Sequence, residues 1–461
     1  MPELRMQLEN IVGIKNVLDD EDAKEKYGQD WTRFFKPAPR AIVFPKNVEE
    51  VQKLVLLARK LKLALVPSGG RTGLSGGAVA ERGEIVVSFE KMAQIVEFSS
   101  VDKTVKVEAG LITQQLQEFA ISKNLFYPVD FASSGSSQMG GNIATNAGGI
   151  KVLRYGLTRD WVMGLTVVTG SGEILHLNKG LTKNATGYDL RHLFIGSEGT
   201  LGFIVEATMK LTKVPKGLSV LLLAVPKMVD IIKVLGAFQE KLILSAFEFF
   251  SEFALQHVLA QGDKAHPFST CSNYYALIEF EDPDGKQLEI AMTCFEACTE
   301  KAWVKDGVLS QSEQQRLDLW HFREAISESI TPYTPYKNDI AVCVSQVPDF
   351  LEATETLIKE RYPEFEIVWF GHIGDGNLHL NILKPETWAV KDFKSECDKV
   401  SEEILTIVAK FDGSISAEHG VGLLKKNHLH FSRSSSEIEY MNAVKKSFDP
   451  DGIMNPGKLL S

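Results

Sequence analysis

The stretch Pro67-Ser68-Gly69-Gly70-Arg71-Thr72-Gly73-Leu74-Ser75-Gly76-Gly77 directly follows a short apolar segment that the sequence predicts to be a strand. Five glycines in these eleven residues leave backbone N–H groups uncovered, and such groups can surround a pyrophosphate. The hydroxyl groups of Ser68, Thr72 and Ser75 add further donors. The loop is therefore a candidate for holding the phosphates of an extended cofactor.

Two further glycine-rich loops occur downstream. One runs from Ser133-Ser134-Gly135 through Gly140-Gly141-Asn142-Ile143-Ala144-Thr145-Asn146-Ala147-Gly148-Gly149, and the other is Gly196-Ser197-Glu198-Gly199-Thr200-Leu201-Gly202. None of the three loops matches the Rossmann fingerprint or the P-loop. A single glycine-rich loop is usually an ordinary turn, whereas three in one region indicate backbone packed closely around a dinucleotide.

The distribution of apolar residues predicts an α+β chain that changes character near Leu218. The first part alternates strands with helices; it has strands at 41–45, 63–66, 84–89 and 203–209, a helix capped by Asn47, and a hairpin over 161–177. The second part has strands at 218–225, 247–250, 274–280, 339–344, 367–370, 379–383 and 414–417, separated by helices near 228–241, 285–301, 348–361 and 391–411. This order predicts a large antiparallel sheet covered by helices on one face.

Length and composition set the broad class of protein. A chain of 461 residues exceeds what one core usually serves, and we expect domains at 1–217 and 218–423 with a C-terminal segment, 424–461, returning to the first. A net charge of −10 argues against nucleic acid as the main partner. The 5 cysteines are sparse, the N-terminus has no apolar signal region, and no run approaches a membrane span. A cytoplasmic protein is expected.

A candidate metal site lies in Gly371-His372-Ile373-Gly374-Asp375-Gly376-Asn377-Leu378-His379-Leu380-Asn381. Asp-Gly is a strong hairpin signal, and a turn at these two residues would place His372 directly opposite His379. Cβ atoms of opposed residues lie about 5 Å apart, so the two imidazoles could share one metal ion. Asn381 would lie on the same face as His379. Ser416-Ala417-Glu418-His419-Gly420 offers a carboxylate as third ligand and a further histidine.

These motifs together resemble the FAD-binding oxidoreductases of the vanillyl-alcohol oxidase type, in particular the D-2-hydroxy acid dehydrogenase branch. The likeness runs from Pro39-Arg40-Ala41 to Asn455-Pro456-Gly457-Lys458. It implies a non-Rossmann FAD-binding domain, a cap domain, and FAD held noncovalently, because Arg71-Thr72 stands where covalent members usually carry a histidine. The FAD contacts implied by the resemblance are Pro67, Ser68, Gly69, Gly70, Arg71, Thr72, Gly73, Ser75, Gly76, Ser133, Ser134, Gly135, Gly140, Gly141, Asn142, Thr145, Asn146, Gly148, Gly149, Gly199, Gly202 and Asn455.

Within this branch the chain is similar to the enzymes that oxidise D-2-hydroxyglutarate to 2-oxoglutarate. The similar stretches are Trp320–Ser327, Tyr336–Asp339, the double-histidine hairpin and Ser416–Gly422. The resemblance implies that a divalent metal, with zinc as the expected ion, is held by His372, His379 and Glu418. It implies His419 as the base that removes the hydroxyl proton, and Arg323, Ser327, Lys337, Asn381 and His419 as substrate contacts. Two departures concern this pocket, because Ser327 replaces an expected threonine and the Arg323–Lys337 spacing is one residue short.

Several alternatives remain open at this stage. A D-lactate or glycolate dehydrogenase of the same family would need one carboxylate clamp, whereas a dicarboxylate favours both Arg323 and Lys337. A metallohydrolase without flavin could use the His, His, Glu set, and an electron-transfer subunit could keep the flavin without catalysis. The family implies a separate electron acceptor, either an electron-transfer flavoprotein or a quinone. It is also compatible with a homodimer and with peripheral docking to a membrane.

Overall fold

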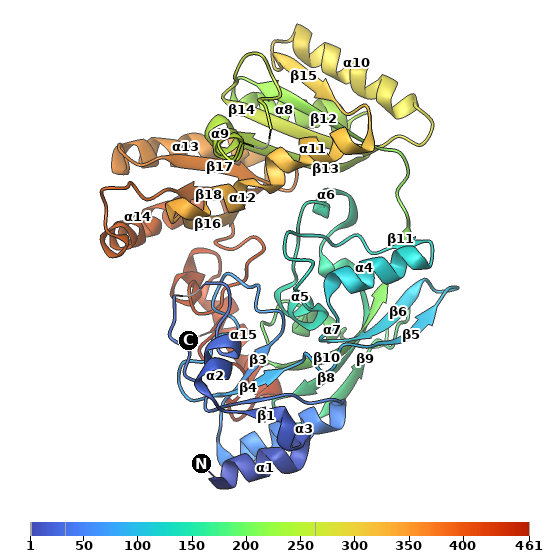
Figure 1. Ribbon diagram of the computed structural model, residues 1–461, viewed down its shortest axis with the longest axis vertical. Coiled ribbons are helices and arrows are strands. Elements are labelled where there is room, and N and C mark those ends of the chain that lie inside the picture. Colours follow the sequence, from blue (N-terminus) through green and yellow to red (C-terminus); the bar gives the residue numbers. More distant parts are fainter. Residues whose placement is uncertain (1, 33, 263, 461) are drawn as a thin grey trace. The chain divides into compact units, whose positions relative to one another are not determined.

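The structure is a computed structural model that describes residues 2–32, 34–262 and 264–460. The chain forms two compact units (Figure 1). The first unit contains Met1–Gly148, Gly156–Val214 and Glu418–Ser461, and the second contains Gly149–Tyr155 and Pro215–Ala417. Among the described residues, no helix has the length and apolar character needed to cross a membrane.

The first sheet of the first unit delivers the first glycine-rich loop. Its order is β1 (Val17–Leu18), β2 (Ala41–Val43), β4 (Ile85–Ser88) and β3 (Leu65–Ser68), with β4 parallel to both β2 and β3. The connecting helix α3 (Val48–Leu61) begins after Asn47, whose side chain accepts the N–H of Glu50 as predicted. Its buried stripe is Val51, Leu54, Val55 and Ala58. The glycine-rich loop therefore starts where β3 ends, at the carboxyl end of the parallel strands β2, β4 and β3.

The second sheet of this unit is antiparallel, in the order β5 (Ile95–Ser99), β6 (Thr104–Glu108), β10 (Gly202–Lys210), β8 (Val162–Thr169) and β9 (Ile174–Leu177). The hairpin predicted over 161–177 is confirmed by the pairing of β8 with β9. The other elements of the unit are α1 (Pro2–Val12), η1 (Ile14–Asn16), α2 (Glu21–Tyr27), α4 (Thr113–Ser122), β7 (Leu125–Phe126), α5 (Met139–Thr145), η2 (Thr158–Trp161), α7 (Arg191–Phe194), β11 (Thr212–Lys213), η5 (Lys426–Phe431) and α15 (Ser435–Phe448).

The second unit is built on one antiparallel sheet of seven strands (Figure 1). Its order is β15 (Asp306–Leu309), β12 (Leu218–Val225), β14 (Tyr274–Glu281), β13 (Leu244–Ser251), β17 (Ile367–Gly371), β18 (Asn377–Ile382) and β16 (Tyr336–Ala341). The predicted strand at 414–417 is wrong, because Ser414 forms only an isolated bridge with Ala341. The large antiparallel sheet itself is confirmed.

Helices cover both faces of this sheet, so the prediction of one covered face is wrong. On β12, Val220, Leu222 and Ala224 pack in a core with residues of α9 (Glu252–Leu259), α11 (Glu313–Glu324) and α12 (Ile326–Ser329). The alternating residues Leu221 and Leu223 are equally buried, at 1% and 0% exposure, so the opposite face is covered too. A second group of helices packs together, namely α8 (Met228–Gln239), α10 (Lys286–Glu300), α13 (Val347–Arg361) and α14 (Val390–Lys410). The remaining short elements are α6 (Val152–Tyr155), η3 (Thr331–Tyr333) and η4 (Val344–Gln346).

Candidate functional site

The first unit contains a pocket lined by the three glycine-rich loops. Many of the predicted FAD contacts line it, namely Pro67, Gly69, Gly70, Arg71, Thr72, Gly73, Ser75, Gly140, Gly141, Asn142, Thr145, Gly199 and Gly202. The other predicted contacts lie outside the lining: Ser68, Gly76, Ser133, Ser134, Gly135, Asn146, Gly148, Gly149 and Asn455. The lining also includes residues that the sequence did not single out, among them Asp30, Phe89, Ala109, Gln138, Glu198 and Phe203.

Close backbone packing explains two of the glycines. A Cβ atom added to Gly70 would lie 2.2 Å from the carbonyl oxygen of Ser136, and one added to Gly140 would lie 2.7 Å from the Cβ of Ala109. A larger residue at position 70 would push the first and second loops apart, and one at position 140 would push the second loop away from the end of β6. The tight spacing brings the two loops together around the pocket, which is the arrangement that the run of glycines predicted.

Arg71 is fixed beside the first loop. Its Nη2 lies 2.8 Å from Glu90 Oε1, and its Nη1 donates to the carbonyl of Gly69 at 2.9 Å. The guanidinium carbon also stands 4.6 Å from the centre of the Tyr27 ring. These contacts hold the cation at the pocket wall, where it adds positive charge near a site suited to phosphates.

Glu198, in the third loop, connects the pocket wall to the segment that follows His419. Its carboxylate accepts the backbone N–H groups of Val421 and Gly422, each at 2.8 Å. Burial raises the pKa of Glu198, and the two N–H donors oppose that rise. A Cβ atom on Gly422 would lie 2.2 Å from the carbonyl oxygen of Ser75. The first loop, the third loop and the 420–422 segment are therefore packed together.

The C-terminal segment also reaches the first loop. The side-chain amide of Asn455 donates to the carbonyl of Gly77 at 2.9 Å and to that of Glu198 at 2.7 Å. Met454 forms an isolated parallel bridge with Leu65 at the start of β3. Asn455 lies outside the pocket lining and joins the first loop to the third through these two hydrogen bonds, whereas Gly77 itself lines the pocket.

The residues present fit FAD on two observations. Gln138 Oε1 is a buried acceptor in the pocket wall with no hydrogen-bond partner in the described part of the chain, and such an atom normally requires a donor. Gly141 lines the same pocket, and a Cβ atom added there would meet nothing within 4 Å. The pocket thus offers bare backbone, an unsatisfied acceptor and open space to an extended ligand with phosphates.

Replacing Gly141 by leucine should lower FAD affinity ~10–100-fold, because the side chain would project into the space that the cofactor needs. Titration of flavin-free protein with FAD measures this. The melting temperature of the flavin-free protein should not fall, since the position is helical and open. Gly236→Leu is the matched control, because Gly236 is also helical with open space but lies on α8 in the other unit. Unchanged FAD affinity in Gly141→Leu would contradict the assignment of the pocket.

The double-histidine hairpin of the second unit has a longer turn than predicted. Phe370, not His372, lies opposite His379, and residues 372–376 form the loop between β17 and β18. A two-residue turn of type I′ would need positive φ at both central residues, but only Gly376 has it, at 84°. Contacts from elsewhere shape the loop, since the N–H of Gly374 donates to Phe247 and Val342 N–H donates to Gly376. The predicted register is therefore wrong.

The two imidazoles nevertheless come together, with ring centroids 5.4 Å apart. Each is paired through Nδ1 with a buried carboxylate. His372 Nδ1 lies 2.8 Å from Glu248 Oε2, and His379 Nδ1 lies 3.8 Å from Asp339 Oδ1. A histidine that binds a metal commonly presents one ring nitrogen to the ion and the other to a carboxylate. The arrangement therefore fits a metal site that uses Nε2 of both rings.

Sequence reasoning missed Glu248 and Asp339. Glu248 lies in the apolar run Phe247-Glu248-Phe249-Phe250 of β13 and is 1% exposed. Burial opposes its ionisation, but the charges of His372 and Arg323 outweigh it, so the pKa of Glu248 is lowered. A charged residue inside an otherwise apolar strand was the one available signal, and it did not identify the partner.

Asp375, in the hairpin loop, is a further acid of this cluster. Burial and the charges of Glu248 and Asp339 raise the pKa of Asp375 to about 6, against the opposing effect of His372. The side chain also accepts the backbone N–H of Asn377 at 3.2 Å. Acidic groups are thus concentrated around the two histidines, which favours a cation there.

The four predicted substrate contacts of the second unit lie over one face of the sheet. Lys337 is opposite Asn381, and Asp339 is opposite His379. The side chains of Lys337 and Asn381 therefore share a face of the sheet with those of Asp339 and His379. Arg323, from α11, places its guanidinium carbon 4.9 Å from the Phe370 ring, and Phe370 is opposite His379 on that same face. The structure therefore brings the predicted cations and the histidines to one side of the sheet.

Arg323 and Lys337 have different surroundings. Arg323 is 6% exposed, its Nη2 lies 2.8 Å from Glu248 Oε2, and its Nε has no hydrogen-bond partner among the described residues. Lys337 is an exposed residue, and its ammonium group donates to Ser327 Oγ at 3.0 Å. Desolvation of the ammonium group lowers the pKa of Lys337. Both cations keep donors for an anionic ligand.

Glu418 and His419 come directly after Ala417, the last residue of the second unit, and are assigned to the first. His419 Nε2 lies 3.7 Å from Glu418 Oε1, and both side chains are about one-fifth exposed, at 21% and 19%. The anchoring of Val421 and Gly422 by Glu198 fixes the backbone that follows them. Their predicted roles remain predictions.

Comparisons with known proteins agree with this architecture. Residues 39–178 match an FAD binding domain, and residues 214–459 match the C-terminal domain of FAD linked oxidases. The chain is 58% identical over 460 residues to a D-2-hydroxyglutarate dehydrogenase of Stutzerimonas stutzeri, covering 100% of this chain and 99% of the relative. It is 53% identical to one of Xanthomonas citri, covering 94% and 92%.

Solved structures share the fold. A substrate complex of p-cresol methylhydroxylase superposes with a TM-score of 0.77 at 15% identity, covering 99% of this chain and 96% of the other. Alkyldihydroxyacetonephosphate synthase superposes with a TM-score of 0.73 at 19% identity, covering 99% and 84%. The predicted vanillyl-alcohol oxidase type of fold is confirmed. The chain belongs to the FAD-linked oxidase family and is an FAD-binding oxidoreductase.

Proposed function

We propose that the chain oxidises D-2-hydroxyglutarate to 2-oxoglutarate, with help from a divalent metal, expected to be zinc. The observation that carries the proposal is the placement of two cations, Arg323 and Lys337, on the same side of one sheet as the paired histidines. A dicarboxylate has two anionic groups to be held, and the relatives named above act on D-2-hydroxyglutarate by name. In this proposal residues 1–217 and 424–461 hold FAD and residues 218–423 hold the substrate.

Arg323 and Lys337 hold the two ends of the substrate. The Arg323 guanidinium is oriented by Glu248 and has an unused buried donor at Nε, so it can hold one carboxylate in a fixed direction. Lys337 donates one N–H to Ser327 Oγ, and its remaining N–H groups can hold the second carboxylate. Asn381, opposite Lys337, contacts the substrate between them in the proposal.

His419 accepts the proton of the C2 hydroxyl group, because a neutral imidazole is a suitable base near neutral pH. His372 and His379, with Glu418 as third ligand, would hold a metal that supplies positive charge where that proton leaves. Glu248 keeps the His372 ring oriented, and Asp339 places a carboxylate 3.8 Å from Nδ1 of His379. Bound FAD would supply the acceptor for the C2 hydrogen, which leaves the substrate as hydride.

Lys337→Met tests the choice of substrate. Loss of the distal ammonium should lower kcat/KM for D-2-hydroxyglutarate ~10–100-fold and leave kcat/KM for D-lactate nearly unchanged, since a monocarboxylate has no group for Lys337 to hold. Because the pKa of Lys337 is already lowered, KM of the wild type for the dicarboxylate should rise as alkaline pH removes the ammonium proton. Equal losses for both substrates would move the proposal toward the D-lactate or glycolate alternative.

FAD should leave the protein on acid precipitation. Among the described residues, the pocket lining contains neither histidine nor cysteine, and Arg71 and Thr72 occupy the corresponding part of the first loop, so we propose noncovalent binding. The absorbance of the supernatant at the flavin maximum measures the released fraction. A yellow pellet with a colourless supernatant would show a covalent bond instead.

The electrons leave to a separate acceptor, which we propose to be an electron-transfer flavoprotein or a quinone. A metallohydrolase without flavin has no support, since residues 39–178 match an FAD binding domain. The electron-transfer subunit without catalysis is disfavoured by the presence of His419 together with the candidate metal ligands. Turnover with an artificial electron acceptor distinguishes it from an active dehydrogenase.

A further inference from the structure

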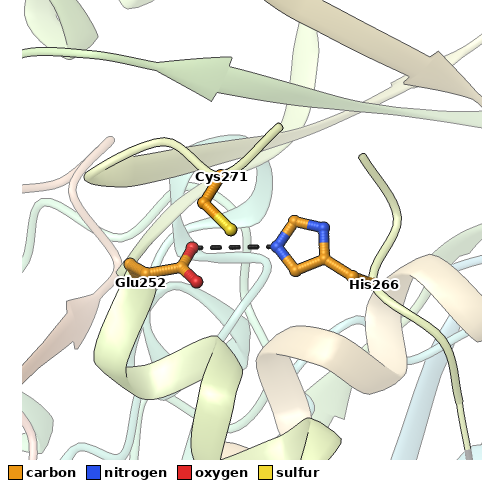
Figure 2. Close-up of side chains that lie close together, drawn as sticks. All are labelled: Glu252, His266 and Cys271. Atoms are coloured by element: carbon orange, nitrogen blue, oxygen red, sulfur yellow. Dashed lines mark ion pairs between the residues drawn. The ribbon is translucent and has the colours of Figure 1, made fainter. Parts of the chain in front are cut away.

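A second group of metal-ligating side chains lies in the second unit, at the beginning of α9. Glu252, His266 and Cys271 present donor atoms that all lie within 4.8 Å of one another. Figure 2 shows the carboxylate, the imidazole and the thiol pointing toward one another. None of the three belongs to the candidate FAD pocket or to the double-histidine hairpin.

His266 is oriented with one ring nitrogen toward this group. Its Nδ1 lies 2.7 Å from the carbonyl oxygen of Phe268 and 3.0 Å from the backbone nitrogen of the same residue. The shorter contact is satisfied by the tautomer that carries the proton on Nδ1. That tautomer leaves a lone pair on Nε2, which lies 3.3 Å from the Tyr275 hydroxyl oxygen and 3.8 Å from Glu252 Oε2. A backbone carbonyl that fixes a histidine tautomer is a common support for metal binding.

Tyr275 supports the Glu252 side chain and the backbone next to Cys271. Its hydroxyl donates to Glu252 Oε2 and accepts the backbone N–H of Ser272 at 3.0 Å. The Tyr275 ring is fully buried, so the hydroxyl has a fixed position. The carboxylate and the backbone next to Cys271 are therefore held by one buried residue.

The donor set selects the class of ion. One thiol, one imidazole and one carboxylate match zinc, whereas Mg²⁺ and Ca²⁺ prefer oxygen donors throughout. Tetrahedral zinc places its ligand atoms roughly 3.5 Å apart, so the group must contract from its present spacing. Cys271 is exposed and can move toward the other two. Three ligands would leave one position for water.

We propose that Glu252, His266 and Cys271 form a second zinc site, separate from the one proposed for His372, His379 and Glu418. On binding, the Cys271 thiol gives up its proton to solvent and the thiolate bonds to the ion. The zinc ion would cross-link the segment before β14, which carries His266 and Cys271, to Glu252 at the start of α9. That helix packs on β13 and β17, the two strands that carry Glu248 and lead into the His372 loop.

Thiol labelling of the full-length protein tests the site without relying on turnover. Cys271 and Cys343 are the exposed cysteines among the described residues, and Cys343 belongs to no group of candidate ligands. Zn²⁺ in molar excess over the two proposed sites should slow alkylation of Cys271 at least ~10-fold and leave the alkylation rate of Cys343 unchanged. Peptide mass spectrometry follows both rates. Mg²⁺ should protect neither cysteine.

Two variants complete the test. His266→Ala should abolish zinc protection of Cys271, whereas His372→Ala should leave it intact, so failure of this site and failure of the proposed catalytic metal are distinguishable. Cys271→Ser should bind one zinc ion fewer than the wild type and keep its fold, because the position is exposed. Equal labelling of Cys271 with and without Zn²⁺ in the wild type would overturn the proposal.

Discussion

Replacing His419 by asparagine is expected to lower the rate of flavin reduction by D-2-hydroxyglutarate ~10²–10⁴-fold, the usual contribution of general-base catalysis. Asparagine keeps a polar side chain of similar reach but cannot accept a proton. Anaerobic stopped-flow measurement at saturating substrate isolates this step from reoxidation. The affinity for substrate should change much less than the rate.

His430→Asn is the matched control for this prediction. His430 is an exposed histidine of the same unit, in η5, and its ring contacts Phe431. Its replacement should leave the rate of flavin reduction unchanged. A wild-type rate in His419→Asn would show that another group, or solvent, removes the hydroxyl proton.

Replacing His379 by alanine should remove the metal proposed above and lower kcat by roughly 10³-fold, because the charge that this metal would place beside the deprotonated hydroxyl is lost. Metal content by elemental analysis and turnover would be measured on the same samples. The Cys271→Ser background keeps the second proposed zinc site from contributing to the count. His257→Ala is the control, since His257 pairs with Glu366 and belongs to no group of candidate ligands in the described part of the chain.

Glu248→Gln should lower the affinity for the metal without abolishing metal binding. The amide keeps the shape of the carboxylate but weakens the support of His372, and loss of such a partner typically costs 10–100-fold in metal affinity. Competition with a chelator measures that affinity. Full activity after the metal has been removed from the wild type would exclude a metal role altogether.

The sequence was sufficient to predict the structure wherever local patterns determine it. β12 begins and ends at the predicted residues, Leu218 and Val225, and α3 starts at the predicted cap, Asn47. Strand periodicity and capping act over a few residues, so they are readable without the fold. The glycine-rich loops were readable as dense local runs of glycine, although the contacts that leave Gly70 and Gly140 no room for a side chain come from Ser136 and Ala109, far away in the sequence.

Long-range contacts explain what the sequence could not reveal. The Asp375-Gly376 pair predicted a tight turn, but Phe247 and Val342 hold the loop open through backbone hydrogen bonds. Glu248 lies 124 residues from His372, the histidine that it orients. The residues next to Glu248 in the sequence do not indicate that partner. Gln138 was likewise recognisable only as a residue two positions before the pair Gly140-Gly141.

The central claim, an FAD-dependent oxidation of a dicarboxylic hydroxy acid, is tested most directly by anaerobic titration of the purified protein. The visible spectrum would be recorded while D-2-hydroxyglutarate and D-lactate are added to parallel samples. The account predicts a flavin spectrum that bleaches with D-2-hydroxyglutarate at far lower concentration than with D-lactate. A protein that carries no flavin and takes up none from added FAD, or a flavin that D-2-hydroxyglutarate leaves oxidised, would contradict it.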